Sequence, residues 1–339
     1  MDLVGIRMPA VSTVSEAEGE FGWPVIDLPI KRWGLTTAYR RQQSEFRQLL
    51  DRFRPDVIHA QGIDVPGYIA VRSGIPAVVT VHGILSEETR YGADLRTRLR
   101  SYLNGLLLER PTVRQATDLI SISPYVTAHY GNLIRGRIHD IPNAIASKYF
   151  DVQRAPERGR LLFAGRVIKR KGVLDLVRAV AECDGHAFRI VIAGAATEPD
   201  YERVLREQAG RLGVTERIDF RGLLDETSML QEFSRAEALV LPSYQETAPM
   251  VIQQAMAAGL AVIATRICGV PHQVTDGVTG LLYEAGDVKA LANLLRRLGM
   301  DSGLSARLGE AGRRVALERY HATSVASATV RAYEQCISP

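Results

Sequence analysis

Cysteine is scarce in this chain: its 339 residues include three, Cys183, Cys268 and Cys336. They are odd in number, far apart in the sequence, and match no zinc-binding or redox spacing. Disulfide frameworks are typical of small secreted domains, and closely spaced cysteine pairs are typical of zinc sites. We therefore expect reduced thiols in a cytoplasmic protein.

Long apolar runs are absent as well, since no segment approaches the roughly 18 residues that a membrane span needs. Residues 1–5 lack the basic and then apolar layout of a signal peptide. Aromatic residues make up 6% of the chain, and no RNA-binding or helix-turn-helix signature is present. The formal charge of +4 suits an anionic ligand or membrane surface without requiring nucleic acid. Nucleic acid is therefore not an expected partner.

Two catalytic signatures are missing. No Asp-x-Asp triplet occurs, so a carboxylate pair that clamps a metal–diphosphate is not indicated. No Gly-x-Ser-x-Gly elbow occurs, which argues against an α/β-hydrolase. What is present is a chain long enough for two domains, with 46% hydrophobic and 24% charged residues, the composition of a soluble globular protein.

Short apolar runs alternate with helical patterns, which predicts an α/β protein with parallel, doubly wound sheets. In the first half, expected strands span 3–8, 25–28, 56–60, 77–81, 119–121 and 137–141, expected helices 37–53, 67–73 and 124–130, and an expected loop 9–22. In the second half, expected strands span 161–164, 188–193, 217–220, 238–241 and 261–264, and expected helices 173–181, 201–212, 227–236 and 250–258. The polar segment 151–159 marks a domain boundary. The expected units are 1–150, 151–310 and a C-terminal helix, 311–339, that packs back on the first domain.

The stretch from residue 90 to 114 is basic, with arginines surrounding leucines. The arginines are Arg90, Arg96, Arg98, Arg100, Arg110 and Arg114. One interpretation is a solvated basic helix face whose leucines pack on the sheet. The other is a helix on a membrane surface, to which the cluster Lys31-Arg32-Trp33 would add.

Residues 242–265 read as a loop, a helix and a buried strand that follow the expected strand 238–241. Glu246 lies in the loop, Pro249 suits the first turn of the helix, and Gly259 ends that helix. A carboxylate at the carboxyl end of a strand, just before a helix, lies where open α/β sheets bind ligands. An ordinary solvated loop glutamate is the alternative.

Residues 165–172 place Arg166, Lys169, Arg170 and Lys171 between two glycines, at the turn from a strand into a helix. Such a turn suits a phosphate group, because the helix N-terminus adds backbone donors and partial positive charge. It is neither a Walker A loop nor Gly-x-Gly-x-x-Gly, and a solvated charge run is the alternative. Gly194 and Gly222 end two further strands near the same edge of the sheet. Glycines, cations and a carboxylate at neighbouring strand ends together indicate a nucleotide site.

His82 is the notable residue of the first half, because it directly follows the expected strand 77–81. A single histidine in this position is commonly a structural hydrogen-bonding residue. The alternative is a catalytic role.

Together these motifs resemble retaining glycosyltransferases of family 4, over nearly the whole chain. Gly165-Arg166 with Lys171-Gly172 is similar to that family's diphosphate-binding element, and residues 242–265 are similar to its acidic signature. Further similar segments are Thr80-Val81-His82-Gly83, Ile141-Pro142-Asn143-Ala144, Cys268-Gly269-Val270-Pro271 and Asp276-Gly277-Val278-Thr279-Gly280. The resemblance implies the GT-B fold, two Rossmann-like domains that face each other across a cleft.

The resemblance also implies a hexosyltransferase that moves a hexose from a nucleotide-diphosphate sugar to an acceptor hydroxyl, with retention of configuration and without metal or other cofactor. Arg166 and Lys171 would stabilise the leaving diphosphate, while Glu246 and His82 would contact the sugar. The other expected donor contacts are Gly165, Gly194, Gly222, Leu223, Thr247, Ala248, Pro249, Met250, Val251 and Gln254. The acceptor would be a glycan or a lipid-linked molecule in polysaccharide or glycoconjugate synthesis, reached in the cytoplasm or peripherally at the inner face of the membrane.

Three departures from the family pattern keep alternatives open. Gln254 stands in place of the family's second glutamate, and Pro249 in place of a glycine. The family's opening strand and Gly-rich loop have no counterpart, so either the chain is truncated at its gene start or this member lacks that unit. The alternatives are a catalytically inactive nucleotide-sugar-binding relative and another GT-B enzyme such as an epimerase.

Overall fold

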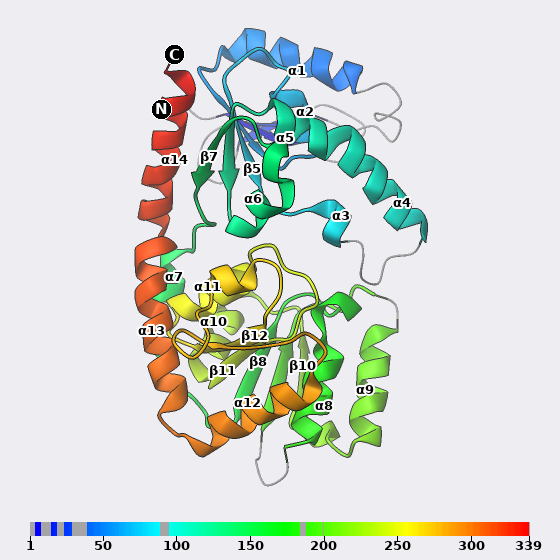
Figure 1. The fold of residues 1–339 in the computed structure, drawn as a ribbon, viewed down its shortest axis with the longest axis vertical. Helices are drawn as coiled ribbons and strands as arrows, with labels where there is room; N and C mark the ends of the chain where they lie inside the picture. Colours follow the sequence, from blue (N-terminus) through cyan, green and yellow to red (C-terminus); the bar gives the residue numbers. More distant parts are fainter. Residues whose placement is uncertain are drawn as a thin grey trace.

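The structure is a computed structural model that describes residues 4–7, 15–18, 24–28, 39–88, 95–183, 188–198 and 200–338. Its two α/β domains lie one above the other in Figure 1. Two long helices, α13 (Leu304–Arg319) and α14 (Ala322–Ile337), run along one side of both domains. None of the described helices is both long and apolar enough to cross a membrane.

The C-terminal domain is built on a parallel sheet with the strand order β10-β9-β8-β11-β12-β13. The strands are β8 (Arg160–Ala164), β9 (Arg189–Ala193), β10 (Ile218–Gly222), β11 (Ala238–Leu241), β12 (Ala261–Thr265) and β13 (Leu281–Tyr283). In order of appearance this is 3-2-1-4-5-6, the doubly wound arrangement. The chain reverses its direction of travel across the sheet between β8 and β11, which pair directly. A ligand site is expected at the carboxyl ends of these two strands.

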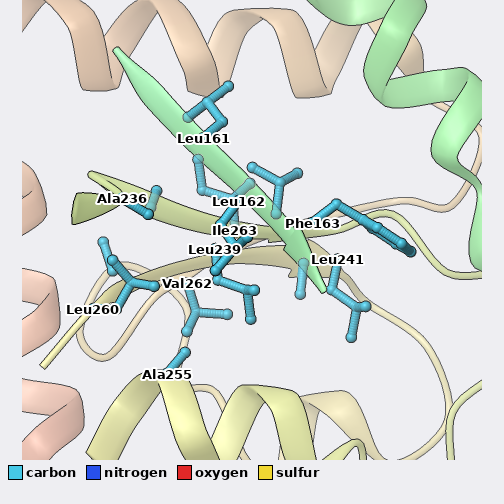
Figure 2. Close-up of a cluster of buried hydrophobic side chains, with 14 of the residues drawn as sticks. Leu161, Leu162, Phe163, Ala236, Leu239, Leu241, Ala255, Leu260, Val262 and Ile263 are labelled. Carbon is cyan, nitrogen blue, oxygen red and sulfur yellow. The ribbon is translucent and has the colours of Figure 1, made fainter. Parts of the chain in front are cut away.

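Helices cover both faces of this sheet, so its central strands are continuous apolar runs. They are α8 (Val173–Ala181), α9 (Tyr201–Arg211), α10 (Glu226–Arg235), α11 (Met250–Ala257) and α12 (Val288–Met300). Figure 2 shows Leu162, Leu239 and Val262 among the side chains that meet in the core, and all three are fully buried. Asp225 and Asp287 cap α10 and α12 by accepting hydrogen bonds from backbone N–H groups.

The N-terminal domain has a parallel sheet with the order β4-β5-β6-β7. Its strands are β4 (Ile58–Gln61), β5 (Ala77–Val81), β6 (Asp118–Ser121) and β7 (Arg137–Asp140). Its helices are α1 (Arg40–Phe53), α2 (Val65–Ala70), α3 (Leu85–Glu88), α4 (Leu95–Asn104), α5 (Arg110–Gln115) and α6 (Pro124–Tyr130), and α7 (Ser147–Phe150) leads into the second domain. This alternation confirms the α/β class predicted from the sequence.

A second, three-stranded sheet precedes it, with the order β1-β3-β2. Its strands are β1 (Gly5–Arg7), β2 (Ser15–Glu18) and β3 (Pro24–Asp27). Among the described strands, β1 is at one edge of this sheet and β4 at one edge of the other. A cavity of about 910 Å³ lies between them, with Ile6 of β1 and Ile58 of β4 in its wall.

The expectation of a loop over residues 9–22 is wrong for residues 15–18, which form β2. They pair antiparallel with β3, from Ser15 opposite Asp27 to Glu18 opposite Pro24. Pairing with another strand thus decides the structure here, where local composition favours a loop. β13 was also missed, because three residues are too few to show a period. Residues 3 and 8 of the expected first strand lie outside the described residues.

The expected packing of leucines from the basic stretch onto the sheet is wrong for most of them. The stretch forms α4, a π-helical turn at Gly105–Glu109 and α5. Ser101, Gly105 and Leu108 form its buried side, whereas Leu95 and Leu99 are exposed. The small residues Ser101 and Gly105, together with Leu108, therefore make the contact with the domain, while Leu95 and Leu99 face away from it. The cluster at residues 31–33 lies outside the described residues.

The two C-terminal helices belong to different domains. α13 packs on the C-terminal domain, where Gly309 comes so close that an added Cβ would lie 2.2 Å from the carbonyl oxygen of Gly259. α14 packs on the N-terminal sheet, where Ala332 joins a buried cluster with Val78 and Ile120. The boundary expected at residue 311 falls inside α13, because the helical pattern alone does not show where the chain crosses between domains.

Candidate active site

The candidate site lies at the carboxyl ends of β8 and β11, where the doubly wound sheet reverses. After β8 the chain passes through Gly165 and Arg166 into a short 3₁₀ turn, Lys169–Lys171, and then through Gly172 into α8. After β11 it forms the loop from residue 242 to 249 and enters α11. The topology therefore brings the predicted cation turn and the predicted acidic loop together.

Lys171 and Glu246 form an ion pair between the two loops, through Nζ and Oε1. The lysine side chain is 14% exposed and the carboxylate 8% exposed. Ser243 donates a second hydrogen bond to the same Oε1 atom, at 2.7 Å. A carboxylate and an ammonium group shielded from water interact strongly with each other and with any charged ligand beside them.

Further hydrogen bonds hold the two loops in register behind this pair. The buried Arg170 donates to the backbone carbonyl of Gln245 at 3.1 Å and to its side-chain oxygen. The N–H group of Tyr244 donates to the carbonyl of Arg170 at 2.9 Å, and its hydroxyl donates to Asp175 on α8 at 2.5 Å. Of the four predicted cations, Arg170 thus supports the loop, while Lys171 faces Glu246.

Glycines allow a close approach of the strand ends on the other side of β8. Gly165 donates its N–H to the carbonyl of Ala193, and Gly194 donates to the carbonyl of Gly222 at 2.7 Å. Gly194 has a φ of +152°, and a Cβ there would lie 1.8 Å from the carbonyl oxygen of Gly165. Arg166 is exposed beside this backbone, and Leu223, just past β10, is 82% exposed.

The N-terminus of α11 adds backbone donors next to Glu246. Thr247, Ala248 and Pro249 are buried just before the helix, and the first helical residue, Met250, is 45% exposed. The buried Thr247 Oγ1 atom has no hydrogen-bond partner among the described residues. A buried hydroxyl usually has a partner, so a polar ligand at this helix terminus would satisfy it. Val251 and Gln254 on α11 are partly buried.

Gly269, in the segment after β12, lies between the loop that carries Glu246 and the N-terminal domain. The carbonyl of Glu246 accepts a hydrogen bond from the N–H group of Gly269 at 3.0 Å. A Cβ on Gly269 would lie 1.6 Å from the carbonyl oxygen of Thr247 and 2.9 Å from Ser123 Oγ, at the start of α6. The site therefore lies between the two domains, with α6 on its far side.

His82 follows β5 on the N-terminal side, and the chain then leads toward the C-terminal domain through α3 (Figure 1). Its Nε2 atom lies 2.6 Å from Gln61 Oε1. An amide oxygen only accepts hydrogen bonds, so Nε2 carries the proton. Desolvation lowers the pKa of His82 below its usual value, and a hydrogen bond with Asn143 opposes that shift. These partners fix the ring orientation from within the N-terminal domain.

A second histidine, His59, links this region to the C-terminal helix. Its Nδ1 atom lies 2.6 Å from the hydroxyl of Tyr333 on α14, and its Nε2 atom lies 2.6 Å from Thr80 Oγ1. Burial, aided by the nearby His82, lowers the pKa of His59 to about 4. His59 is therefore neutral at pH 7 and hydrogen-bonded on both ring nitrogens.

We expect His59 to make the protein sensitive to acid. The unfolded chain takes up this proton near the usual pKa of 6.5, and the folded protein only near 4. Stability is therefore complete above about pH 6.5 and falls as the pH drops toward 4, by at most about 3 kcal/mol. Urea unfolding of the wild type and of His59→Gln across this pH range measures it. The variant should lose less stability on acidification, and equal losses would contradict the assignment.

Comparison with known proteins agrees with this geometry. Residues 147–315 match the family of glycosyl transferases group 1, and residues 7–144 match the glycosyl transferase 4-like domain. A glycogen synthase of Mycobacterium tuberculosis is 30% identical over 292 residues, which cover 83% of this chain and 69% of that protein. The chain belongs to the group 1 glycosyl transferases. It is a transferase that moves a glycosyl group from a nucleotide sugar.

Other relatives of this glycosyltransferase have names that describe different activities. The alpha-maltose-1-phosphate synthase of Mycolicibacterium smegmatis is 27% identical over 292 residues, covering 77% of this chain and 73% of that protein. The D-inositol 3-phosphate glycosyltransferase of Streptomyces avermitilis is 36% identical over 183 residues, covering 51% of this chain and 39% of that protein.

Solved structures share the fold of this glycosyltransferase, which confirms the predicted GT-B architecture. The sucrose-phosphate synthase of Thermosynechococcus elongatus superposes with a TM-score of 0.79 at 22% identity, over 98% of this chain and 88% of that one. The Anabaena protein HepE, solved in complex with UDP and glucose, superposes with a TM-score of 0.74 at 20% identity, over 92% and 86% of the two chains.

Of the predicted catalytic residues, the structure brings Lys171 and Glu246 into contact. Arg166 is exposed in the turn that follows β8, and His82 belongs to the other domain, with its described partners there. Sequence reasoning missed Gln61, the residue that orients His82. The available signal was its place at the carboxyl end of β4, beside β5, because functional residues gather at that edge of a parallel sheet.

Proposed function

We propose that this glycosyltransferase moves a hexose from a nucleotide-diphosphate sugar to an acceptor hydroxyl, with retention of the anomeric configuration. The observation that carries the proposal is the shielded Lys171–Glu246 pair at the reversal point of the donor-domain sheet. A cation beside an anion at this position offers one charge to a diphosphate and the other to sugar hydroxyls. The HepE complex, which holds UDP and glucose in the same fold, supports this class of donor.

The proposed mechanism assigns a role to each charged group. Negative charge develops on the leaving diphosphate as the glycosidic bond breaks, and Lys171 and the exposed Arg166 stabilise it. Glu246 accepts hydrogen bonds from the sugar, and the first N–H groups of α11 bind further oxygen atoms. His82, neutral at pH 7 and protonated on Nε2, contacts the sugar from the N-terminal domain. Because side chains supply the positive charge, we propose that transfer needs no metal.

Other donor contacts are proposed at the remaining strand ends. Gly165, Gly194, Gly222 and Leu223 would border the nucleotide, where the glycine backbone lets a ligand approach closely. Gln254 would bind ribose hydroxyls through its amide. The proposed acceptor is a glycan or a lipid-linked molecule in polysaccharide or glycoconjugate synthesis. The proposed location is the cytoplasm, with peripheral contact to the inner face of the membrane.

A panel of UDP-, GDP- and ADP-sugars tests the donor assignment through the release of free nucleotide. We expect saturable turnover with one base and equal rates with and without EDTA. Proton NMR of the transferred sugar should show the donor's anomeric configuration, and inversion would overturn the retaining assignment. Saturable binding without turnover by any donor would instead indicate a nucleotide-sugar-binding relative, the reading that Gln254 suggests.

A further inference from the structure

The transfer reaction leaves unused an exposed apolar stripe that begins on α4 and continues into the π-helical turn. Six exposed large hydrophobic side chains fall between residues 95 and 107 and are called the α4 stripe here: Leu95, Leu99, Tyr102, Leu103, Leu106 and Leu107. Leu95 is 82% exposed, Tyr102 59% and Leu99 58%. Exposed apolar residues that gather in one place mark an interaction site.

The stripe runs along one side of the helix. Positions 95, 99, 102, 103 and 106 recur at intervals of three or four residues, which places them one above another. Ser101 and Gly105, on the opposite side, are buried against the domain. Figure 1 shows α4 on the outer flank of the N-terminal domain, away from α14. The apolar side of this helix therefore faces outward.

Arginines flank the stripe on both sides. Arg96 and Arg100 lie along one border and Arg98 along the other, at 3.6 residues per turn, and all three are exposed. No Asp or Glu occurs between residues 95 and 108. A long arginine side chain keeps its charge at a polar surface while its stem covers apolar groups. An apolar stripe with a positive border on each side is complementary to a lipid bilayer that carries negative charge.

We propose that the α4 stripe inserts into the interface of an anionic membrane, with Arg96, Arg98 and Arg100 at the headgroups. The helix would lie in the plane of the bilayer, because its other side, which includes Ser101 and Gly105, is buried against the domain. This inference rests on the proposed peripheral location and not on the donor chemistry. An enzyme held in this way would meet a lipid-linked acceptor at the bilayer surface.

Flotation of the full chain with vesicles tests the proposal. With equal parts of phosphatidylcholine and phosphatidylglycerol at about 50 mM salt, we expect binding that weakens at about 500 mM salt. Leu99→Asp with Leu106→Asp should reduce the affinity about 100-fold, because two apolar groups leave the bilayer. Replacing the three arginines with glutamine should also reduce it about 100-fold.

Matched controls make the same changes elsewhere. Leu212→Asp with Leu317→Asp alters two leucines that are 41% and 45% exposed, one just after α9 and one on α13, and should leave binding unchanged. Nucleotide release from a soluble donor should be equal in all variants, so failure of membrane binding and failure of transfer are told apart. Absence of vesicle binding, or wild-type binding by the Leu99/Leu106 variant, would overturn the proposal. The proposal would also be overturned if light scattering showed that the wild type is a dimer and the Leu99/Leu106 variant a monomer. The stripe would then be a self-association surface.

Discussion

Replacing Lys171 with alanine is expected to lower kcat by about 10³-fold, in line with other losses of one charge-stabilising group from a preorganised site. The ammonium group is the cation held against Glu246, and it is positioned before any donor arrives. No reorganisation is then needed as charge develops on the leaving diphosphate. Initial rates of nucleotide release, with the donor that the panel identifies, measure this loss.

The same substitution is also expected to cost about 3 kcal/mol of stability, because it leaves a buried carboxylate without its cation. Lys171→Met combined with Glu246→Gln separates the two effects, since it removes both charges. We expect this double variant to regain wild-type stability within about 1 kcal/mol while kcat stays low. Lys289→Ala, an exposed lysine on α12, should change neither quantity. Recovery of activity in the double variant would show that the pair has a structural role only.

The centre of the donor domain could be predicted closely from the sequence because the strands β8, β11 and β12 are buried on both faces. A strand such as β11 is a continuous apolar run with clear ends, and the helix expected at 173–181 coincides with α8. Because the ends of these strands are clear in the sequence, Lys171 and Glu246 could each be predicted to follow a separate strand. That they meet follows from the strand order, because β8 and β11 are neighbours in the sheet although far apart in the sequence.

The parts that sequence reasoning missed depend on contacts between distant segments. The strand at residues 15–18 exists through its pairing with β3, and Gln61 reaches His82 from the neighbouring strand. The leucines of α4 have the helical spacing of a core face, and spacing alone does not tell which side meets the domain. That side is instead the one with Ser101 and Gly105.

Gly172→Ala is expected to reduce kcat about 100-fold by separating the two loops of the donor site. Gly172 has a φ of +66°, and a Cβ there would lie 2.0 Å from the carbonyl oxygen of Pro242, the first residue of the acidic loop. One backbone must move away, and that shift carries Lys171 away from Glu246. A displacement of about 1 Å at a catalytic group can cost about 100-fold in rate. Nucleotide release measures kcat, and urea unfolding measures the stability.

Gly213→Ala is the matched control because Gly213 has nearly the same backbone conformation, with a φ of +68°, and open space around it. Both variants should lose about 1 kcal/mol of stability, because a residue with a side chain is unfavourable in the left-handed region. Only Gly172→Ala adds the collision with Pro242. This overpacking should lower the stability by a further amount of roughly 1 to 3 kcal/mol. The difference between the variants therefore isolates the contact between the loops. Equal kcat values would show that the site tolerates this separation, and that the close approach at Gly172 serves folding and not the positioning of Lys171.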